Sequence, residues 1–261
     1  MPDHSATVAV IAGGTQGLGL AIARRLIADG CPRLVIAGRR VTEGEAAADA
    51  LRRETRAEVR FIPADMGKVE DAIELIDRAA SRFGALTALV NAAATTERGS
   101  ILTTTPADFD KHMAVNARGP FFALQRFAQL AVDKGHAASV VNILSMVIHC
   151  GQSYLAPYSA SKAALANVTK NAAQALRTQK IRVNGINCGW MDTPGEDATQ
   201  KRFHGAGDDW LMQAEARQPF GILVKPAHVA GLVSYMLSSD SGVMTGALVD
   251  FDQNVAGAYP E

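Results

Sequence analysis

Short apolar runs that alternate with helical patterns fill most of this chain, and this alternation restricts its fold more than any other feature. The apolar runs occupy residues 7–12, 33–38, 58–64, 86–93, 139–144 and 181–187. Strands that are apolar throughout, with helical stretches between them, are typical of a parallel sheet that helices cover on both faces. We therefore predict an α/β fold with a doubly wound parallel sheet.

The length and the charge of the chain favour one domain that binds small molecules. A chain of 261 residues is long enough for one large α/β domain, and no linker-like segment divides it, so we expect a single domain over residues 1–261. The 26 basic residues balance the 26 acidic ones, and neither charge forms a long block. Nucleic acids and anionic membranes are therefore poor candidates for partners, and a small-molecule substrate fits better.

The N-terminus and the cysteines favour a cytoplasmic location. Residues 1–14 lack a basic n-region, and their apolar stretch is too short for a signal peptide or a membrane span. The three cysteines are an odd number without CxxC spacing, which argues against a disulfide framework or a zinc site. The six histidines show no ligand-like spacing, so we expect no metal.

A glycine-rich turn follows the first apolar run and precedes a helical pattern. Glycine permits a tight turn and lets backbone N–H groups approach a pyrophosphate at a helix N-terminus. The spacing G-x-x-x-G-x-G differs from G-x-G-x-x-G, and a purely structural turn is the alternative. The residues of the turn that we predict to bind a dinucleotide are Gly13, Thr15, Gln16, Gly17, Leu18 and Gly19.

The residues at the end of the second apolar run indicate whether NADP or NAD is bound. An acid about 20 residues beyond the last glycine commonly holds the ribose 2′-OH, and Gly38 occupies that place here. Arg39 and Arg40 follow, and a guanidinium suits the 2′-phosphate of NADP. We therefore favour NADP, held by Arg39, over NAD. The alternative is that both arginines only end a strand in solvent, which leaves NAD acceptable.

A further part of the dinucleotide site is predicted after the third apolar run. Asp65 could accept a hydrogen bond from the adenine amino group, with Met66 beside it. Asp65 could equally be the N-cap of a helix that begins near Lys68. Both interpretations stay open at this point.

A serine, a tyrosine and a lysine are combined in residues 145–162. Ser145 follows the apolar run 139–144, which is predicted to be a buried strand. If Pro157 opens a helix, Tyr158 and Lys162 stand four residues apart on one face of it. The three side chains can then converge on one cavity.

This set of side chains suits proton transfer at a substrate oxygen. Hydride transfer between a nicotinamide and a carbonyl or alcohol carbon requires a proton to move at the oxygen, and Tyr158 is the predicted proton carrier. A Lys162 ammonium about 4 Å away would favour the phenolate by about 4 kcal/mol at an effective dielectric of about 20. Ser145 would stabilise charge on the substrate oxygen. A tyrosine and a lysine at this spacing also occur by chance in an ordinary packing helix.

The glycine turn, Asn116, Ser145, Tyr158 and Lys162 together resemble the short-chain dehydrogenase/reductase family, in its single-domain subgroup. The likeness covers nearly the whole chain. The resemblance implies a Rossmann-type fold, a nicotinamide dinucleotide that also contacts the catalytic tyrosine and lysine, and a homotetramer. It implies that Asn116 helps to hold a water linking the lysine to solvent, and that residues 244–252 contain the last strand.

Two other segments resemble family motifs with substitutions. The family's Asn-Asn-Ala-Gly segment appears here as Asn91 followed by three alanines, so Asn91 is carried over as a cofactor-site residue. The family's Asn-Pro-Gly segment ends here at Gly189, with Cys188 in place of proline, and Thr193 follows. The resemblance implies that Gly189 and Thr193 belong to the cofactor site, where Thr193 reaches the nicotinamide carboxamide.

Substrate choice is predicted to lie in residues 189–221, the one long irregular stretch, which suits a lid or binding element. Its mixture of polar and aromatic side chains favours a small polar substrate such as a sugar or polyol. The leading hypothesis is an oxidoreductase that transfers a hydride between NAD(P) and a CH–OH or C=O group. A reductase of 3-oxoacyl thioesters is the alternative enzyme, and a dinucleotide-binding sensor or scaffold is the non-catalytic alternative.

Overall fold

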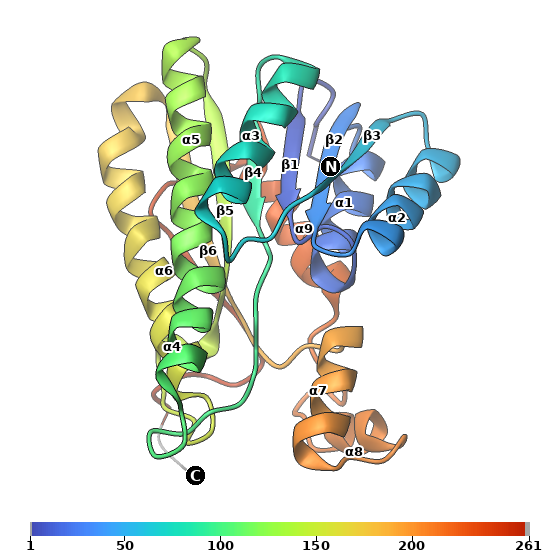
Figure 1. Ribbon diagram of the computed structural model, residues 1–261. Helices are drawn as coiled ribbons and strands as arrows, with labels where there is room; N and C mark the ends of the chain where they lie inside the picture. Colours follow the sequence, from blue (N-terminus) through green and yellow to red (C-terminus); the bar gives the residue numbers. More distant parts are fainter. Residues whose placement is uncertain (1, 259–261) are drawn as a thin grey trace.

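The strands form one sheet in which every pairing is parallel (Figure 1). The computed structural model describes residues 2–258, so the first residue and the last three of the predicted domain 1–261 lie outside the description. The strands are β1 (Val8–Ala12), β2 (Arg33–Gly38), β3 (Glu58–Pro63), β4 (Ala88–Asn91), β5 (Ala138–Ser145), β6 (Ile181–Cys188) and β7 (Leu248–Phe251). Their order across the sheet is β3-β2-β1-β4-β5-β6-β7.

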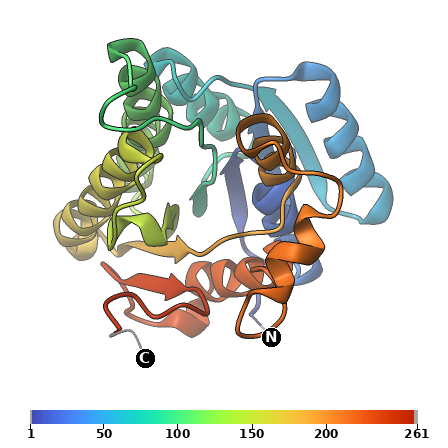
Figure 2. The same cartoon turned by 90° about the horizontal axis from the view of Figure 1, so that it is seen from below.

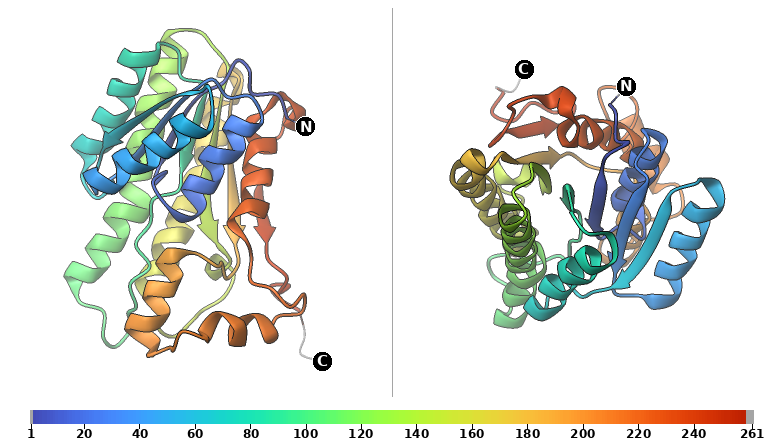
Figure 3. Two further views of the ribbon diagram at one scale, coloured as in Figure 1. Left: turned by 90° about the vertical axis from the view of Figure 1, so that its right-hand side faces the viewer. Right: turned by 90° about the horizontal axis from the view of Figure 1, so that it is seen from above.

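Helices cover both faces of this sheet (Figure 3). The α-helices are α1 (Gly17–Ala28), α2 (Val41–Glu54), α3 (Val69–Phe83), α4 (Pro106–Met113), α5 (Gly119–Asp133), α6 (Ala156–Leu176), α7 (Pro194–His204), α8 (Trp210–Ala216) and α9 (Pro226–Leu237). Helices α1, α2 and α9 pack on one face, and α3, α5 and α6 pack on the other. Within residues 2–258, no helix combines the length and apolar character needed to cross a membrane.

Strand β1 contributes to two core layers, one on each face of the sheet. Val8 and Val10 pack in the layer beneath α3 and α5, whereas Ala9 and Ile11 pack in the layer beneath α1 and α9. All four are at most 2% exposed. Burial on both faces explains why such strands are apolar throughout. The predicted doubly wound α/β fold is therefore confirmed.

The predicted strands all form, but the prediction of irregular backbone over residues 189–221 is wrong. Helices α7 and α8 occupy most of that stretch. Thr193 is the N-cap of α7, where its side chain accepts a hydrogen bond from the Glu196 N–H at 3.1 Å. Pro194 follows as the first helical residue, a position in which proline costs no hydrogen bond. Whether the segment acts as a lid stays a prediction.

The direction of strand order changes beside β1, which has β2 on one side and β4 on the other. Ligand sites in open parallel sheets form outside the carboxyl ends of the strands at such a point. Helices α7 and α8 lie beyond this end of the sheet in Figure 1, and Figure 2 looks onto it from below. The topology therefore positions a site between the sheet and these two helices.

Candidate active site

A cavity of about 1040 Å³ opens at the carboxyl end of the sheet. Its walls come from the glycine turn after β1, the segment after β4, the start of α6 and the start of α7. The predicted site residues that line it are Gly13, Thr15, Gln16, Gly17, Leu18, Gly19, Arg39, Asp65, Met66, Ser145, Tyr158, Lys162, Gly189 and Thr193. Two predicted residues, Asn91 and Asn116, do not line it.

The glycine turn is tight because its glycines lie against other backbone atoms. Gly13 has φ +84° and Gly17 has φ +52°, values that favour glycine. A Cβ on Gly19 would lie 2.0 Å from the carbonyl oxygen of Gly13, and one on Gly13 would lie 2.5 Å from the Ala93 nitrogen. The turn therefore packs directly on the segment after β4.

The turn leads into the N-terminus of α1, which faces the cavity. Gln16 is the N-cap residue, and its side chain makes no capping hydrogen bond. The first N–H groups of an α-helix have no partner within the helix, and they favour a phosphate. The turn and this helix N-terminus therefore fit a pyrophosphate group.

The two arginines after β2 differ in their surroundings. Gly38 ends the strand, so no carboxylate stands at the place expected for a ribose-binding acid. The Arg40 guanidinium donates to Gln16 Oε1 at 2.5 Å and lies 3.5 Å from a Glu43 carboxylate oxygen. Within residues 2–258, no hydrogen bond or ion pair holds the exposed Arg39 guanidinium. Arg39 is therefore the arginine of this pair with its donors free for an anion.

Asp65 stabilises a turn at the edge of the cavity and is not the N-cap of α3. Its Oδ1 accepts a hydrogen bond from the Gly67 N–H at 3.0 Å, and its own N–H donates to Asp71 Oδ2 at 2.8 Å. The N-cap position of α3 belongs to Lys68. The N-cap interpretation is therefore wrong, because the turn separates Asp65 from the helix. Met66 is buried beside it.

Ser145, Tyr158 and Lys162 meet on the wall of the cavity formed by β5 and α6. Ser145 is the last residue of β5, and its Oγ accepts a hydrogen bond from Val147 N–H at 3.4 Å. Helix α6 carries Pro157 in its first turn, as predicted, so Tyr158 and Lys162 share one face of the helix. Lys162 Nζ donates to the Ile143 carbonyl at 2.7 Å and lies 5.8 Å from the centre of the Tyr158 ring.

Burial governs the protonation of Tyr158 and Lys162. Burial raises the pKa of Tyr158 to about 12, although the Ser145 side chain lowers it in part. Burial also lowers the pKa of the Lys162 ammonium to about 8. The sequence-based expectation of a lowered phenol pKa is therefore not met, because withdrawing the phenolate from water raises the pKa. The phenol is therefore protonated at neutral pH.

Asn116 lies behind the cavity wall and joins the segment after β4 to the catalytic helix. It belongs to η1 (Ala114–Arg118), a π-helical turn between α4 and α5 of the kind often found at functional sites. Its Oδ1 accepts from the Thr95 N–H at 2.8 Å, and its Nδ2 donates to the Thr95 carbonyl at 2.9 Å. Nδ2 also approaches the Ser161 Oγ at 3.0 Å, and Ser161 directly precedes Lys162.

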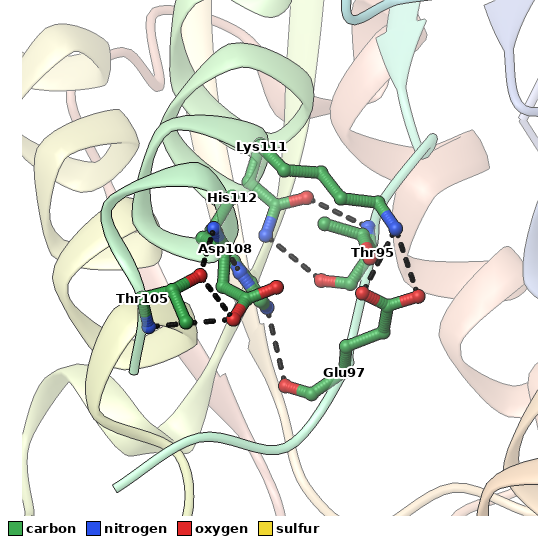
Figure 4. Close-up of polar contacts among 7 residues, drawn as sticks. Thr95, Glu97, Thr105, Asp108, Lys111 and His112 are labelled. Atoms are coloured by element: carbon green, nitrogen blue, oxygen red, sulfur yellow. Dashed lines mark hydrogen bonds and ion pairs between the residues drawn. The ribbon is translucent and has the colours of Figure 1, made fainter. Parts of the chain in front are cut away.

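Glu97 ties the same segment to α4 (Figure 4). Both carboxylate oxygens of Glu97 lie 2.8 Å from Lys111 Nζ. The Glu97 carbonyl lies 3.2 Å from Nε2 of the buried His112. The segment after β4 is therefore fixed to helices at two successive points, Thr95 and Glu97, where it borders the cavity.

Three residues that the family resemblance assigned to the cofactor site, Asn91, Gly189 and Thr193, differ from one another in their surroundings. Asn91 is buried inside the sheet, where its Nδ2 donates to Asn142 Oδ1 at 2.8 Å, so the alanines after it line the cavity instead. Gly189 makes room for the Asp252 side chain, since a Cβ on Gly189 would lie 2.3 Å from Asp252 Oδ1. Thr193 faces the glycine turn, since a Cβ on Gly17 would lie 3.7 Å from its Cβ.

Sequence reasoning missed several residues that line the cavity from other parts of the chain. Arg98 comes from the segment after β4, Tyr154 from the loop before α6, and Asp252 and Asn254 from the residues after β7. Only Asp252 had a sequence signal, the glycine at 189 that makes room for it. Within residues 2–258, no group of three or more His, Cys, Asp or Glu side chains could hold a metal ion.

Comparison with known proteins shows which proteins this chain resembles over most of its length. The family model described as enoyl-(acyl carrier protein) reductase matches residues 12–253. The NADP-dependent (R)-specific alcohol dehydrogenase of Lentilactobacillus kefiri is 32% identical over 242 residues, which cover 92% of each chain. The (3R)-3-hydroxyacyl-CoA dehydrogenase of Rattus norvegicus is 31% identical over 253 residues, which cover 93% of each chain. The solved structure of levodione reductase is 27% identical, with a TM-score of 0.89, and the match covers 97% of this chain and 98% of that chain.

Proposed function

This chain belongs to the short-chain dehydrogenase/reductase family, and we propose that it transfers a hydride between NADP and a small polar alcohol or carbonyl compound. Its relatives include dehydrogenases named for alcohol and 3-hydroxyacyl-CoA substrates. The observation that carries the proposal is the meeting of Ser145, Tyr158 and Lys162 on one wall of the cavity that begins at the glycine turn. These side chains can exchange a proton with a substrate oxygen in that cavity.

The residues of the glycine turn fit a dinucleotide. Gly13 and Gly19 leave no room for a Cβ, and the uncapped N-terminus of α1 offers N–H donors to a pyrophosphate. Gly38 and Arg39 favour a ribose that carries a 2′-phosphate, because a guanidinium is present and a carboxylate is absent at that place. Bound there, the dinucleotide supplies the hydride donor or acceptor. Asp65 and Met66 border the adenine end in this proposal.

Tyr158 is the proton donor to the substrate oxygen in reduction and the proton acceptor in oxidation. Its pKa, raised to about 12 by burial, keeps the phenol protonated and ready to donate at neutral pH. Ser145 stabilises charge on the same oxygen by hydrogen bonding. At neutral pH the phenol can therefore donate its proton directly to a carbonyl oxygen, whereas oxidation of an alcohol needs the phenolate.

Lys162 and Asn116 support Tyr158 from the protein side. The Lys162 ammonium, 2% exposed and held by the Ile143 carbonyl, contributes positive charge beside the phenol. That charge favours the phenolate that forms when the proton leaves. Asn116 fixes Ser161 and so the turn of α6 between Tyr158 and Lys162. Its role in holding a water that links the lysine to solvent stays a proposal from the family resemblance.

The polar lining of the cavity favours a small polar substrate over a 3-oxoacyl thioester. Gln152, Glu196, Gln200 and Asn254 all line the cavity. Burying an acyl chain against such side chains would withdraw their remaining polar atoms from water, which costs free energy. The proposal therefore keeps a sugar, polyol or related compound as the substrate class.

Two further proposals come from the family resemblance and from the sequence features described above, respectively. They are a homotetrameric assembly and a cytoplasmic location. Light scattering on the purified protein tests the first, and fractionation of the cells that produce it tests the second. Neither enters the chemistry of the site.

Hydride transfer by the purified protein tests the proposed function. We expect NADPH to be consumed with small polar carbonyl compounds, and Tyr158→Phe to lower kcat/KM by at least about 100-fold. Tyr235→Phe, which removes the hydroxyl of a partly exposed tyrosine on α9, is the matched control and should retain full activity. Equal activity in wild type and Tyr158→Phe would contradict the proposal. Turnover with a 3-oxoacyl thioester only would favour the alternative enzyme, and NADP binding without any turnover would favour the sensor.

A further inference from the structure

Arg98 brings a largely buried positive charge into the substrate cavity. It lies on the segment after β4, which Asn116 and Glu97 hold in position, and it lines the cavity. Its side chain is only 14% exposed. A guanidinium withdrawn from water costs free energy unless an anion or enough acceptors surround it. The partners of Arg98 therefore decide whether its hydrogen-bond donors and its charge are already compensated within the protein.

The hydrogen bonds of Arg98 use only part of its donors. Nε donates to Nε2 of His204 at 3.1 Å, and Nη1 donates to the Thr96 carbonyl at 3.0 Å. A guanidinium has five N–H donors, so three of them have no hydrogen-bond partner within residues 2–258. Both acceptors are neutral when the histidine accepts, so neither one compensates the charge.

The carboxylate nearest to Arg98 is already engaged with other donors. Glu196 Oε1 forms an ion pair with Nη2 of Arg98 at 3.7 Å, a distance too long for a hydrogen bond. The same oxygen accepts hydrogen bonds from Trp190 Nε1 at 2.8 Å and Gln200 Nε2 at 2.7 Å. Glu196 therefore lowers the electrostatic cost of burying Arg98 but leaves its donors free.

Aromatic contacts keep the guanidinium in place within reach of the catalytic group. Arg98 lies over the Tyr154 ring at 5.4 Å from its centre, and the Tyr154 and His204 rings pack edge to face at 5.4 Å. Arg98 and Tyr158 line the same cavity. An anionic group on Arg98 and a reacting carbon beside Tyr158 can therefore belong to one small molecule.

We propose that Arg98 is the specificity-determining residue of an anion subsite, and that the substrate carries a carboxylate or phosphate together with the reacting CH–OH or C=O group. A guanidinium binds either anion through paired N–H donors. The inference rests on the proposed function and deepens it, since it narrows the small polar substrate to an acidic one.

Matched pairs of compounds test this subsite. The panel consists of hydroxy acids of three to six carbons, the polyols that carry CH₂OH in place of the carboxylate, and the corresponding phosphate esters. With NADP, we expect the wild type to favour one anionic series over the polyols by at least about tenfold in kcat/KM. Arg98→Met should lower kcat/KM for that series by about 100-fold and change the polyols by less than about threefold. The series whose kcat/KM falls in Arg98→Met shows whether the subsite binds a carboxylate or a phosphate.

Arg53→Met is the matched control, because Arg53 is exposed on α2 and does not line the cavity. It removes the same charge, and it should leave the preference for the anion unchanged. An equal loss for anions and polyols in Arg98→Met would overturn the proposal, because Arg98 would then only hold α7 in place. An unchanged preference in Arg98→Met would overturn it as well.

Calorimetric binding separates this proposal from the proposed function. Tyr158→Phe with NADP bound should take up the preferred anion with nearly the affinity of the wild type, and the double variant with Arg98→Met should not. Binding that depends on Arg98 without any turnover in the wild type would support the subsite and reject the reaction. Turnover of polyols with no binding of carboxylate or phosphate would reject the subsite and keep the reaction.

Discussion

Asn116 holds both backbone groups of Thr95, with its Oδ1 2.8 Å from the Thr95 nitrogen and its Nδ2 2.9 Å from the Thr95 oxygen. The same amide reaches Ser161 on the catalytic helix. One side chain thus provides hydrogen-bond partners for the N–H and carbonyl groups of an irregular backbone segment and fixes that segment to the helix that carries Tyr158. The cavity wall after β4 depends on this amide for its position.

Replacing Asn116 should therefore reduce both stability and activity. Asn116→Ala leaves the Thr95 N–H and carbonyl without partners, which should cost about 2–4 kcal/mol of unfolding free energy. Urea unfolding measures the loss, and initial rates should fall because Thr95 lines the cavity. Asn171→Ala is the control, since Asn171 is exposed and bonds only to Asn167. Similar losses in both variants would contradict the role given to Asn116.

The sheet was predictable from the sequence because its strands are buried on both faces. Residues 33–38, predicted as a strand, match β2 residue for residue, since a run with no polar interruption allows few other structures. The helices of residues 189–221 were not predictable in the same way. The apolar pattern that would mark a helix packed on the core is short there. The start of α7 depends on the Thr193 cap and Pro194, a local pattern that is hard to recognise among the neighbouring glycine and aspartate residues.

The catalytic side of the cavity was predictable from the sequence, whereas the substrate side was not. Tyr158 and Lys162 are close in sequence, so helical spacing alone brings them together. Arg98 and Glu196 are far apart in sequence and meet only because the segment after β4 and α7 both cross the carboxyl end of the sheet. The raised pKa of Tyr158 also required the structure, since burial and not spacing causes it.

Arg39 should determine the preference for NADP. Arg39→Ala removes a guanidinium that no partner within residues 2–258 holds, so we expect it to weaken NADP binding by about 10- to 100-fold, the worth of one charge-assisted contact to a phosphate. NAD binding should change by less than about threefold, because NAD lacks the 2′-phosphate. Fluorescence titration with both dinucleotides measures these changes.

Arg40→Ala is the matched control for that prediction. Arg40 follows Arg39 directly and is equally exposed to solvent at the end of β2, but Gln16 and Glu43 already hold it. We expect it to weaken both dinucleotides to a similar, small extent. An equal loss of NADP and NAD affinity in Arg39→Ala would show that the arginine does not recognise the 2′-phosphate.

Gly19→Ala should abolish dinucleotide binding. The added Cβ would lie 2.0 Å from the Gly13 carbonyl oxygen, a contact between backbone elements that no side-chain rotation relieves. The turn must open, which moves the N–H groups of α1 away from a pyrophosphate. Gly151→Ala is the control, since a Cβ there would meet no heavy atom within 4 Å. Tight NADP binding in Gly19→Ala, measured by calorimetry, would be inconsistent with this packing.

The two directions of the reaction should respond differently to pH. The phenol of Tyr158, with a pKa of about 12, stays protonated across the neutral range, so kcat/KM for carbonyl reduction should be nearly constant from pH 6 to about 8. Oxidation needs the phenolate, and its kcat/KM should rise with pH. The rise should become shallower as the Lys162 ammonium, with a pKa of about 8, loses its proton. Lys162→Met should remove that change of slope, and a flat oxidation profile in the wild type would contradict the assignment of Tyr158.

A buried histidine far from the cavity should make stability depend on pH. His4 is 0% exposed, and its Nε2 lies 3.0 Å from Ser234 Oγ, which in turn donates to Asp29 Oδ2 at 2.5 Å. Burial lowers the pKa of His4 below its usual 6.5, although its contacts with Ser234 and Asp29 oppose the change. This histidine therefore stays neutral in the folded chain at a pH where it is protonated in the unfolded chain.

The sign of the effect follows from which state binds the proton. Below about pH 6.5 the unfolded chain gains a proton on His4 that the folded chain does not take up, so the free energy of unfolding falls as the pH falls. Urea unfolding at pH 8 and pH 5.5 should show this loss in the wild type, above the range where carboxylates are protonated. His4→Gln should be less stable than the wild type at pH 8, and the gap should narrow at pH 5.5, because glutamine takes up no proton. His228→Gln, at an exposed position of α9, is the control. A gap that widens at pH 5.5 would mean that His4 is protonated in the folded chain and that Asp29 stabilises its charge.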